Sequence, residues 1–242
     1  VSFTPTAVQS YSGNLTVNSN ATSGVASLAL SGAGLPPPPA ITSGLSANGT
    51  EGVAFSYQVS ASNNATSYGA TSLPAGLSLN ATTGLISGTP TTAGNSSVTL
   101  TATNAGGTGN ATLALTISPS RIIGLSGNLS FGNTTETQST QRVLAITNTG
   151  SGNLTVTGIT YPSGFSGNWS GTIMPGATQN VTVLFSPTAV QSYGGNVVVN
   201  SNASSGNGSI ACSGNGIALT RIISLSGNLS FGQLSVNQTA NR

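Results

Sequence analysis

The chain has 242 residues and a mass of only 23.6 kDa, because Gly, Ser, Thr and Asn dominate it. Four Arg and two Glu are its only charged side chains, and Lys, Asp and His are absent. General acid–base catalysis needs titratable groups, metal sites need clusters of His, Cys or carboxylate, and nucleic-acid binding needs a basic footprint. The composition therefore predicts a protein that is not an enzyme, holds no metal or cofactor and binds no nucleic acid.

The chain is nevertheless expected to fold. Apolar residues make up 36% of it and its net charge is only +2, whereas disordered chains combine low hydrophobicity with high net charge. No run of 18 apolar residues occurs, so no membrane-spanning segment is predicted. The single cysteine allows no disulfide within the chain.

Residues 1–34 are a copy of a segment near the other end of the chain. VSFTPTAVQSYSGNLTVNSNATSG at residues 1–24 aligns with VLFSPTAVQSYGGNVVVNSNASSG at residues 183–206, a constant offset of 182. Alternation of apolar and polar residues, typical of a strand with one buried face, predicts β-structure in both copies. We expect Tyr11 and its counterpart Tyr193 to be structural corner residues.

Four consecutive prolines separate this segment from the next. Residues 35–39, Leu-Pro-Pro-Pro-Pro, favour an extended polyproline II conformation that cannot join the interior of a sheet, so they are predicted to be a domain linker. In residues 40–118 the period-two pattern continues, and Gly, Asn and Pro break it at intervals of roughly 8–12 residues. These features predict a β-sandwich over residues 40–118.

A complete second sandwich is predicted for residues 119–217, and residues 218–242 repeat its beginning. RIIGLSGNLSFG at residues 121–132 aligns with RIISLSGNLSFG at residues 221–232, an offset of 100. Equivalents of residues 143–182 occur in neither terminal segment. The overall prediction is an all-β chain of tandem sandwiches in a linear array.

Both patterns resemble known families. Residues 119–217, with SGNLSFG, LAITNTGSGNLTVTGI and PGATQNVTVLFSPTA, resemble the ASH or "choice-of-anchor D" type of immunoglobulin-like domain. Residues 40–118, with LPAGLSLNATTGLISGTPT, resemble an immunoglobulin-like domain common in bacterial surface proteins and haemolysins. The resemblance implies non-catalytic sandwiches in large secreted or surface proteins, with residues 1–34 and 218–242 as the C-terminal part and N-terminal strands of further ASH-like domains.

Asparagine occurs in Asn-x-Ser/Thr sequons more often than the Ser and Thr content of the chain would produce by chance. Ser and Thr make up 72 of 242 residues, so chance would place about seven of the 24 asparagines in sequons, whereas 16 are found there. Such triplets are acceptors for N-linked glycans in secreted proteins. The candidate acceptors are Asn14, Asn20, Asn48, Asn64, Asn80, Asn95, Asn110, Asn128, Asn133, Asn153, Asn168, Asn180, Asn202, Asn207, Asn228 and Asn237.

Dense N-glycosylation would also explain the missing charge. Charged side chains normally keep exposed strands from associating edge to edge, and a sugar coat would replace that protection. Where a sequon lies in a strand, its central residue is expected to point to the core and its Asn and Ser/Thr outward. The alternative is that Asn, Ser and Thr are abundant on turns and outer faces and form sequons by coincidence.

Two accounts of the terminal segments are open, because neither segment has enough strands to bury both faces of a sheet. The sequence is a window of a longer tandem protein, or neighbouring copies complete each other's partial sandwiches by strand addition. We predict a structural subunit of an extracellular or cell-surface fibre or stalk, assembled head to tail under covalent glycans. The alternative is an adhesin-type module that recognises a glycan or protein through its loops, which an exposed aromatic cluster at one end of a domain would favour.

The remaining distinctive residues are given structural roles. Cys212 aligns with Leu30, so a buried apolar position is expected, and Trp169 is predicted to fill the core. Glu51 and Glu136 lie in different domains and are not expected to form a pair. The arginines stand at matching repeat positions and are predicted to anchor strand ends or contact a neighbouring domain; they are Arg121, Arg142, Arg221 and Arg242.

Overall fold

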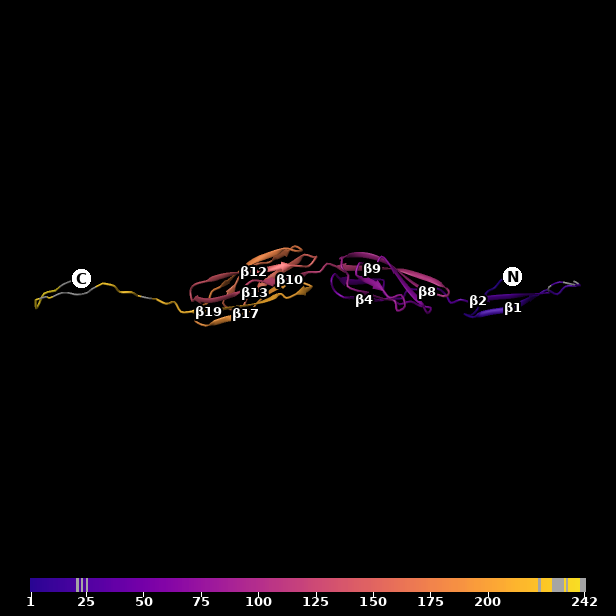
Figure 1. Ribbon diagram of the computed structural model, residues 1–242, viewed down its shortest axis with the longest axis horizontal. Helices are drawn as coiled ribbons and strands as arrows, with labels where there is room; N and C mark the ends of the chain where they lie inside the picture. Colours follow the sequence, from indigo (N-terminus) through magenta and orange to yellow (C-terminus); the bar gives the residue numbers. More distant parts are fainter. Residues whose placement is uncertain are drawn as a thin grey trace.

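The computed structural model describes residues 1–20, 22, 24, 26–221, 223–227, 233 and 235–239. Within these residues the chain forms strands, turns and loops, and no helix is present that could cross a membrane. Two sandwiches lie in line between a hairpin near the N-terminus and the described part of the C-terminal segment (Figure 1). The prediction of an all-β chain with tandem sandwiches is confirmed.

The N-terminal hairpin consists of β1 (Ser10–Thr16) and β2 (Ser27–Ala33), which pair antiparallel. Its counterparts near the other end are β17 (Ser192–Ser201) and β19 (Ser209–Ile217). Ser10 pairs with Ala33 in the first hairpin, and Ser192 pairs with Asn215 in the second, both shifted by the offset of 182. The repeated sequence therefore forms the same hairpin in the same register.

The N-terminal sandwich packs a four-stranded sheet, in the order β3-β9-β8-β5, against a three-stranded sheet, β4-β7-β6. Alternate apolar residues of β8 and β9 face inward, as period two requires, and join Val59 and Ile86 in one buried core. The strands are β3 (Ser46–Thr50), β4 (Phe55–Gln58), β5 (Ser67–Thr71), β6 (Leu77–Leu79), β7 (Leu85–Gly88), β8 (Gly94–Asn104) and β9 (Gly107–Ser118).

The C-terminal sandwich has two five-stranded sheets, in the orders β14-β16-β12-β10-β18 and β11-β19-β17-β13-β15. Its core holds the three rings of Phe131, Phe165 and Phe185 in mutual contact, with centroids 4.8–5.6 Å apart. Its other strands are β10 (Ile122–Ser126), β11 (Ser130–Thr135), β12 (Thr140–Asn148), β13 (Leu154–Thr160), β14 (Phe165–Ser166), β15 (Gly171–Ile173), β16 (Thr178–Phe185) and β18 (Ser205–Gly206).

One buried asparagine in each sandwich fixes the turn against which the incoming linker lies. Asn104 donates from Nδ2 to the carbonyls of Pro37 and Asn63, both at 2.8 Å, and accepts from the Gly106 N–H. The proline run is thus held against the turn between β8 and β9. Because a Cβ at Gly106 would clash with the Pro36 carbonyl, only glycine allows this approach.

Asn148 has the same role in the C-terminal sandwich. Its Nδ2 donates to the carbonyls of Gly152 (2.8 Å) and Ile173 (2.9 Å), and its Oδ1 accepts from the Gly150 N–H. A Cβ at Gly150 would clash with the carbonyl of Ser120 in the linker between the sandwiches. An Asn-x-Gly turn therefore receives the incoming chain in both domains.

The structural roles expected for the tyrosines are confirmed. Tyr193 Oη accepts hydrogen bonds from the backbone N–H groups of Thr188 (3.1 Å) and Ala189 (3.0 Å). Tyr11 Oη accepts the corresponding bonds from Thr6 and Ala7. Each tyrosine ties the chain that enters its hairpin to the first strand.

Cys212 lies where the sequence predicts, whereas Trp169 reaches the edge of the core and does not fill it. Cys212 is buried in the core of the C-terminal sandwich, and Trp169 is half-buried and packs against that core. Burial raises the pKa of the Cys212 thiol above its ordinary value. The buried Cys212 thiol is therefore not available as a surface reactive group.

The anchoring role predicted for the arginines is seen at one of the three that the structure describes. Arg121 donates from Nε to the Asn202 carbonyl at 2.9 Å, which ties the start of β10 to the end of β17, a strand-end anchor as predicted. The Arg142 guanidinium lies over the Phe131 ring, 5.9 Å from its centroid, a cation–π contact that the sequence does not reveal. Arg221 is exposed, and Arg242 lies outside the described residues.

Candidate glycan-acceptor surface and unpaired hairpin face

All fifteen sequon asparagines within the described residues are exposed. They occur on strands, as Asn180 does in β16, and on turns, as Asn80 does between β6 and β7. The sixteenth, Asn228, lies outside the described residues. The two asparagines that are buried, Asn104 and Asn148, do not begin sequons.

The amide nitrogens of these sequon residues are free of protein partners. N-glycans attach to Nδ2, so a side chain that donates from Nδ2 to the protein is a poor acceptor. In the part of the chain that the structure describes, Nδ2 donors to protein atoms are Asn63, Asn104, Asn148, Asn200 and Asn215, and none of them begins a sequon.

Several sequon asparagines instead use Oδ1, which orients the side chain without occupying its nitrogen. Asn80 Oδ1 accepts from the N–H groups of Thr82 and Thr83, at 3.0 and 3.1 Å. Asn202 Oδ1 accepts from the Thr155 N–H at 2.8 Å. These bonds use Oδ1 and leave Nδ2 of Asn80 and Asn202 without a protein partner.

Sequons on or beside strands follow the expected alternation. In Asn180-Val181-Thr182 the central valine is buried, and its two neighbours are exposed. Leu129 and Leu154 are likewise buried at the centres of the triplets that begin at Asn128 and Asn153. A glycan at such a site would stand on the outer face of its sheet while the central residue stabilises the core.

The outer face of the four-stranded sheet gathers several candidates. Asn48 in β3 and Asn95 in β8 both pair with Thr116 of β9, so the three residues form one row across the sheet. Asn110 lies on the same strand as Thr116, an even number of residues away, and is therefore on the same face. With three asparagines and one threonine, this part of the outer face is polar but uncharged.

Among the residues that the structure describes, no sheet packs against the inner face of the N-terminal hairpin. Phe3 is 54% exposed, whereas its counterpart Phe185 is fully buried. Leu15 and Val17 are 38% and 56% exposed, and their counterparts Val197 and Val199 are buried in the C-terminal sandwich. The side chains that form a core in the complete sandwich are thus open to solvent in the hairpin.

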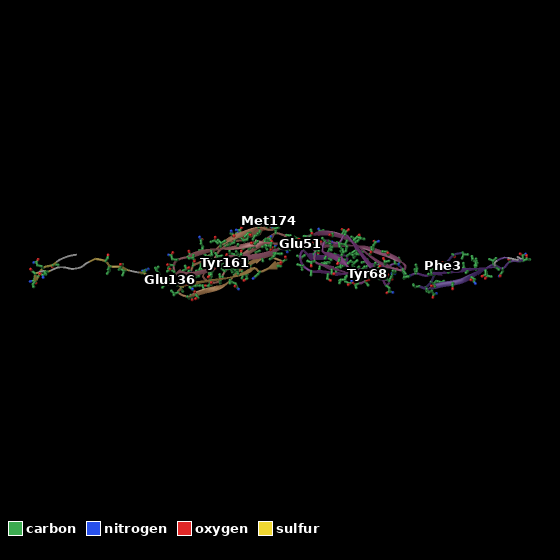
Figure 2. The ribbon with its side chains drawn as sticks, in the orientation of Figure 1. Phe3, Glu51, Tyr68, Glu136, Tyr161 and Met174 are labelled. Carbon is green, nitrogen blue, oxygen red and sulfur yellow. The ribbon has the colours of Figure 1, made fainter. Side chains whose placement is uncertain are left out.

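The two carboxylates are separated, as expected. Glu51 lies at the junction of the two sandwiches, and Glu136 lies toward the opposite end of the C-terminal one (Figure 2). Glu51 accepts a hydrogen bond from the hydroxyl group of Ser151, which joins the two domains. The described residues include no group of three or more His, Cys, Asp or Glu side chains that could hold a metal ion.

Comparison with protein-family models assigns both sandwiches. Residues 38–118 match the family described as "Putative Ig domain", and residues 122–215 match the HYDIN/CFA65/VesB-like, Ig-like domain family. The chain is a tandem array of immunoglobulin-like domains. The linker-holding role of Asn104 and Asn148 was not predicted. Its signal in the sequence is the Asn-x-Gly spacing at the end of a strand, which occurs in both immunoglobulin-like domains.

Solved structures similar to these immunoglobulin-like domains come from several kinds of protein. The I-band fragment I67-I69 of titin is 12% identical, with a TM-score of 0.40, over 81% of this chain and 71% of the fragment. The ASH/PapD-like domain of human CEP192 is 15% identical, with a TM-score of 0.36, over 40% of this chain and 87% of that one. No curated protein matches the sequence.

Two solved structures of Bacteroides fragilis proteins are also similar to part of this chain. A "putative alpha-galactosidase/melibiase" is 26% identical, with a TM-score of 0.33, over 39% of this chain. The matching region spans about a fifth of the length of both Bacteroides proteins, 21% and 20%.

Proposed function

We propose that this chain is a structural, non-catalytic subunit of an extracellular, heavily N-glycosylated fibre or surface stalk that assembles head to tail. The observation that carries the proposal is the sequon surface: every described sequon asparagine is exposed and has an unbonded Nδ2. Glycans at these positions would hydrate a surface that has only six charged side chains. Immunoglobulin-like domains are common in extracellular and surface proteins, which agrees with this location.

Intact-mass measurement of protein purified from its natural source tests the proposal. The expected result is a heterogeneous mass well above 23.6 kDa that collapses to the polypeptide mass after enzymatic removal of N-glycans, with Asp at the formerly occupied sequons. A single mass at that of the bare polypeptide would overturn the proposal.

The internal repeat provides a matched pair of variants for expression in a glycosylating host. Asn14 begins a sequon, whereas its counterpart Asn196 lacks one only because Val198 stands where the first copy has Thr16. Both asparagines are exposed. We expect Thr16→Val to remove one glycan mass and Val198→Thr to add one, provided that exposure and the sequon together decide occupancy.

The adhesin alternative is less well supported by the aromatic side chains. Recognition of a glycan or protein through sandwich loops would use exposed rings at one end of a domain. Within residues 40–217 every Phe, Tyr and Trp side chain is buried or half-buried. Phe3, which packs on the hairpin, is an exposed aromatic residue (Figure 2). Its counterpart Phe185 is a core residue, so the exposure of Phe3 is better explained by an uncovered core face than by a ligand site.

A further inference from the structure

The exposed face of the N-terminal hairpin has the same side-chain packing as the buried face of β17 and β19 in the C-terminal sandwich, but no second sheet covers it in the described structure. The rings of Phe3 and Tyr11 are 5.4 Å apart at 74°, and those of Phe185 and Tyr193 are 5.4 Å apart at 71°. Phe3 lies so close over Gly32 that a Cβ there would be 2.8 Å from its ring. The hairpin thus has the register, the corner and the ring packing of β17 and β19 without their cover.

A hollow of about 320 Å³ lies on this face, lined by Val1, Phe3, Tyr11, Leu30 and Gly32 among others. The complete sandwich shows what belongs there. Phe131, at the start of β11, packs against Phe185 with ring centroids 5.6 Å apart. β11 pairs in parallel with β19, and Ser130 lies opposite Ser213.

The chain carries a second copy of the segment that fills the hollow. Residues 225–232, LSGNLSFG, are identical to residues 125–132, so Phe231 is the counterpart of Phe131. The hairpin and the described part of the C-terminal segment lie at opposite ends of the array, with both sandwiches between them (Figure 1). A second copy of the chain can supply this segment to the hairpin without any change in that arrangement.

We propose that residues 230–235 of a second copy of this chain add to β2 as a parallel strand and place Phe231 in the hollow beside Phe3. The inference deepens the proposed head-to-tail assembly and rests on it. By the two repeat offsets, Ser230 lies opposite Ser31 and Gln233 opposite Ala33. The contact joins the tail of one copy to the head of the next, so it is heterologous and extends into a filament.

The proposed contact between β2 and residues 230–235 is more apolar than the equivalent contact between β19 and β11. In the complete sandwich Asn215 donates to Asn133 Oδ1, and the buried Thr134 hydroxyl bonds to Thr140. Ala33 and Leu234 stand at the positions of Asn215 and Thr134. An added strand with Leu234 therefore brings apolar surface to the exposed face and leaves no buried hydroxyl group there without a partner.

Disulfide trapping tests the register directly. In a Cys212→Ala background, Ser31→Cys combined with Ser230→Cys should form reducible bonds between chains and give a ladder of multimers. The corresponding pair in the complete sandwich, Ser130→Cys with Ser213→Cys, is the positive control and should close within one chain, because the two hydroxyl groups are 3.5 Å apart. Protein made without N-glycans is used, so the outcome does not depend on glycosylation.

Two further variants make the result decisive. Ser27→Cys with Ser230→Cys moves the cysteine four positions along β2, about 13 Å from the proposed partner, and should give no ladder. Phe231→Asp, added to the first pair, should lower the yield of multimers roughly tenfold or more, since it would place a charge in the apolar hollow. Monomers only, despite closure of the positive control, or equal ladders from both cysteine pairs, would overturn the proposal.

Discussion

Two tyrosines of the C-terminal sandwich have hydroxyl groups in opposite situations. Tyr193 Oη holds the corner before β17 through two backbone N–H donors. Tyr161 Oη is buried without a hydrogen-bond partner, and burial raises the pKa of its phenol group. The same residue type therefore contributes a structural bond at one position and an unsatisfied polar atom at the other.

Phenylalanine at each position should separate these effects. Tyr193→Phe is expected to lower the free energy of unfolding by about 1–2 kcal/mol, because two backbone groups lose their acceptor. Tyr161→Phe is expected to be neutral or stabilising by up to about 1 kcal/mol, since the unpaired hydroxyl group is removed. Urea unfolding followed by the fluorescence of Trp169, the single tryptophan, measures both. Equal losses in the two variants would contradict the assignment.

Cys212 predicts a dependence of stability on pH. Its pKa is raised by burial in the folded state, so the stabilisation from the neutral thiol is complete below the unfolded pKa of roughly 8.5 and is lost as pH rises. The melting temperature of the C-terminal sandwich should therefore fall between about pH 8 and 9.5.

The control is Cys212→Ala, which creates a small cavity and lowers stability at neutral pH. Its melting temperature should change less over the same pH interval, because no thiol remains to ionise. If the melting temperatures of the wild-type protein and the variant fall equally with pH in this interval, the buried thiol is not the titrating group.

At the scale of elements, period-two patterning predicted the strands and their buried faces well. Val181, Val183 and Phe185 alternate with polar residues, and all three are buried in β16. The parallel pairing of β3 with β9 could not be predicted, because nothing in a strand's own alternation specifies its neighbour. The free Nδ2 of the sequon asparagines also required coordinates, since hydrogen-bond partners such as Thr155 and Asn202 are distant in sequence.

The Asn-x-Gly turns make a prediction about the linkers. Gly150→Ala should destabilise the C-terminal sandwich by about 1–3 kcal/mol, because the added methyl group displaces the Ser120 carbonyl and with it the linker. Gly158→Ala is the matched control, as open space surrounds that position, and it should change stability by less than about 0.5 kcal/mol. Fluorescence of Trp169 during urea unfolding reports on both, and similar losses would contradict the role of Gly150.

At the scale of the whole molecule, two consecutive hydrogen bonds connect the linker and both sandwiches. The Ser120 N–H donates to Ser151 Oγ at 3.1 Å, and Ser151 donates to Glu51 of the other domain. One of the chain's two carboxylates is thus used at the domain junction. The array should therefore behave as a stiff rod across this linker.

Distances between spin labels can measure this stiffness. Labels at Ser78→Cys and Thr172→Cys, both exposed and one in each sandwich, should give a narrow distribution in a Cys212→Ala background. Ser151→Ala should broaden it, because Glu51 and the linker lose their common partner. Ser163→Ala, an exposed loop position, is the control. A broad distribution without the Ser151 substitution would show that the junction is flexible.

The parallel pairs β3–β9 and β11–β19 determine how the molecule responds to tension. In both sandwiches a strand near the entry of the chain lies parallel to the last one, so a pull on the two ends acts along these strands and loads their hydrogen bonds in shear. The bonds of a ladder must then yield together rather than unzip one by one. A tether built from such units would resist stretching until an entire sandwich ruptures, and single-molecule extension should show discrete steps of one domain each.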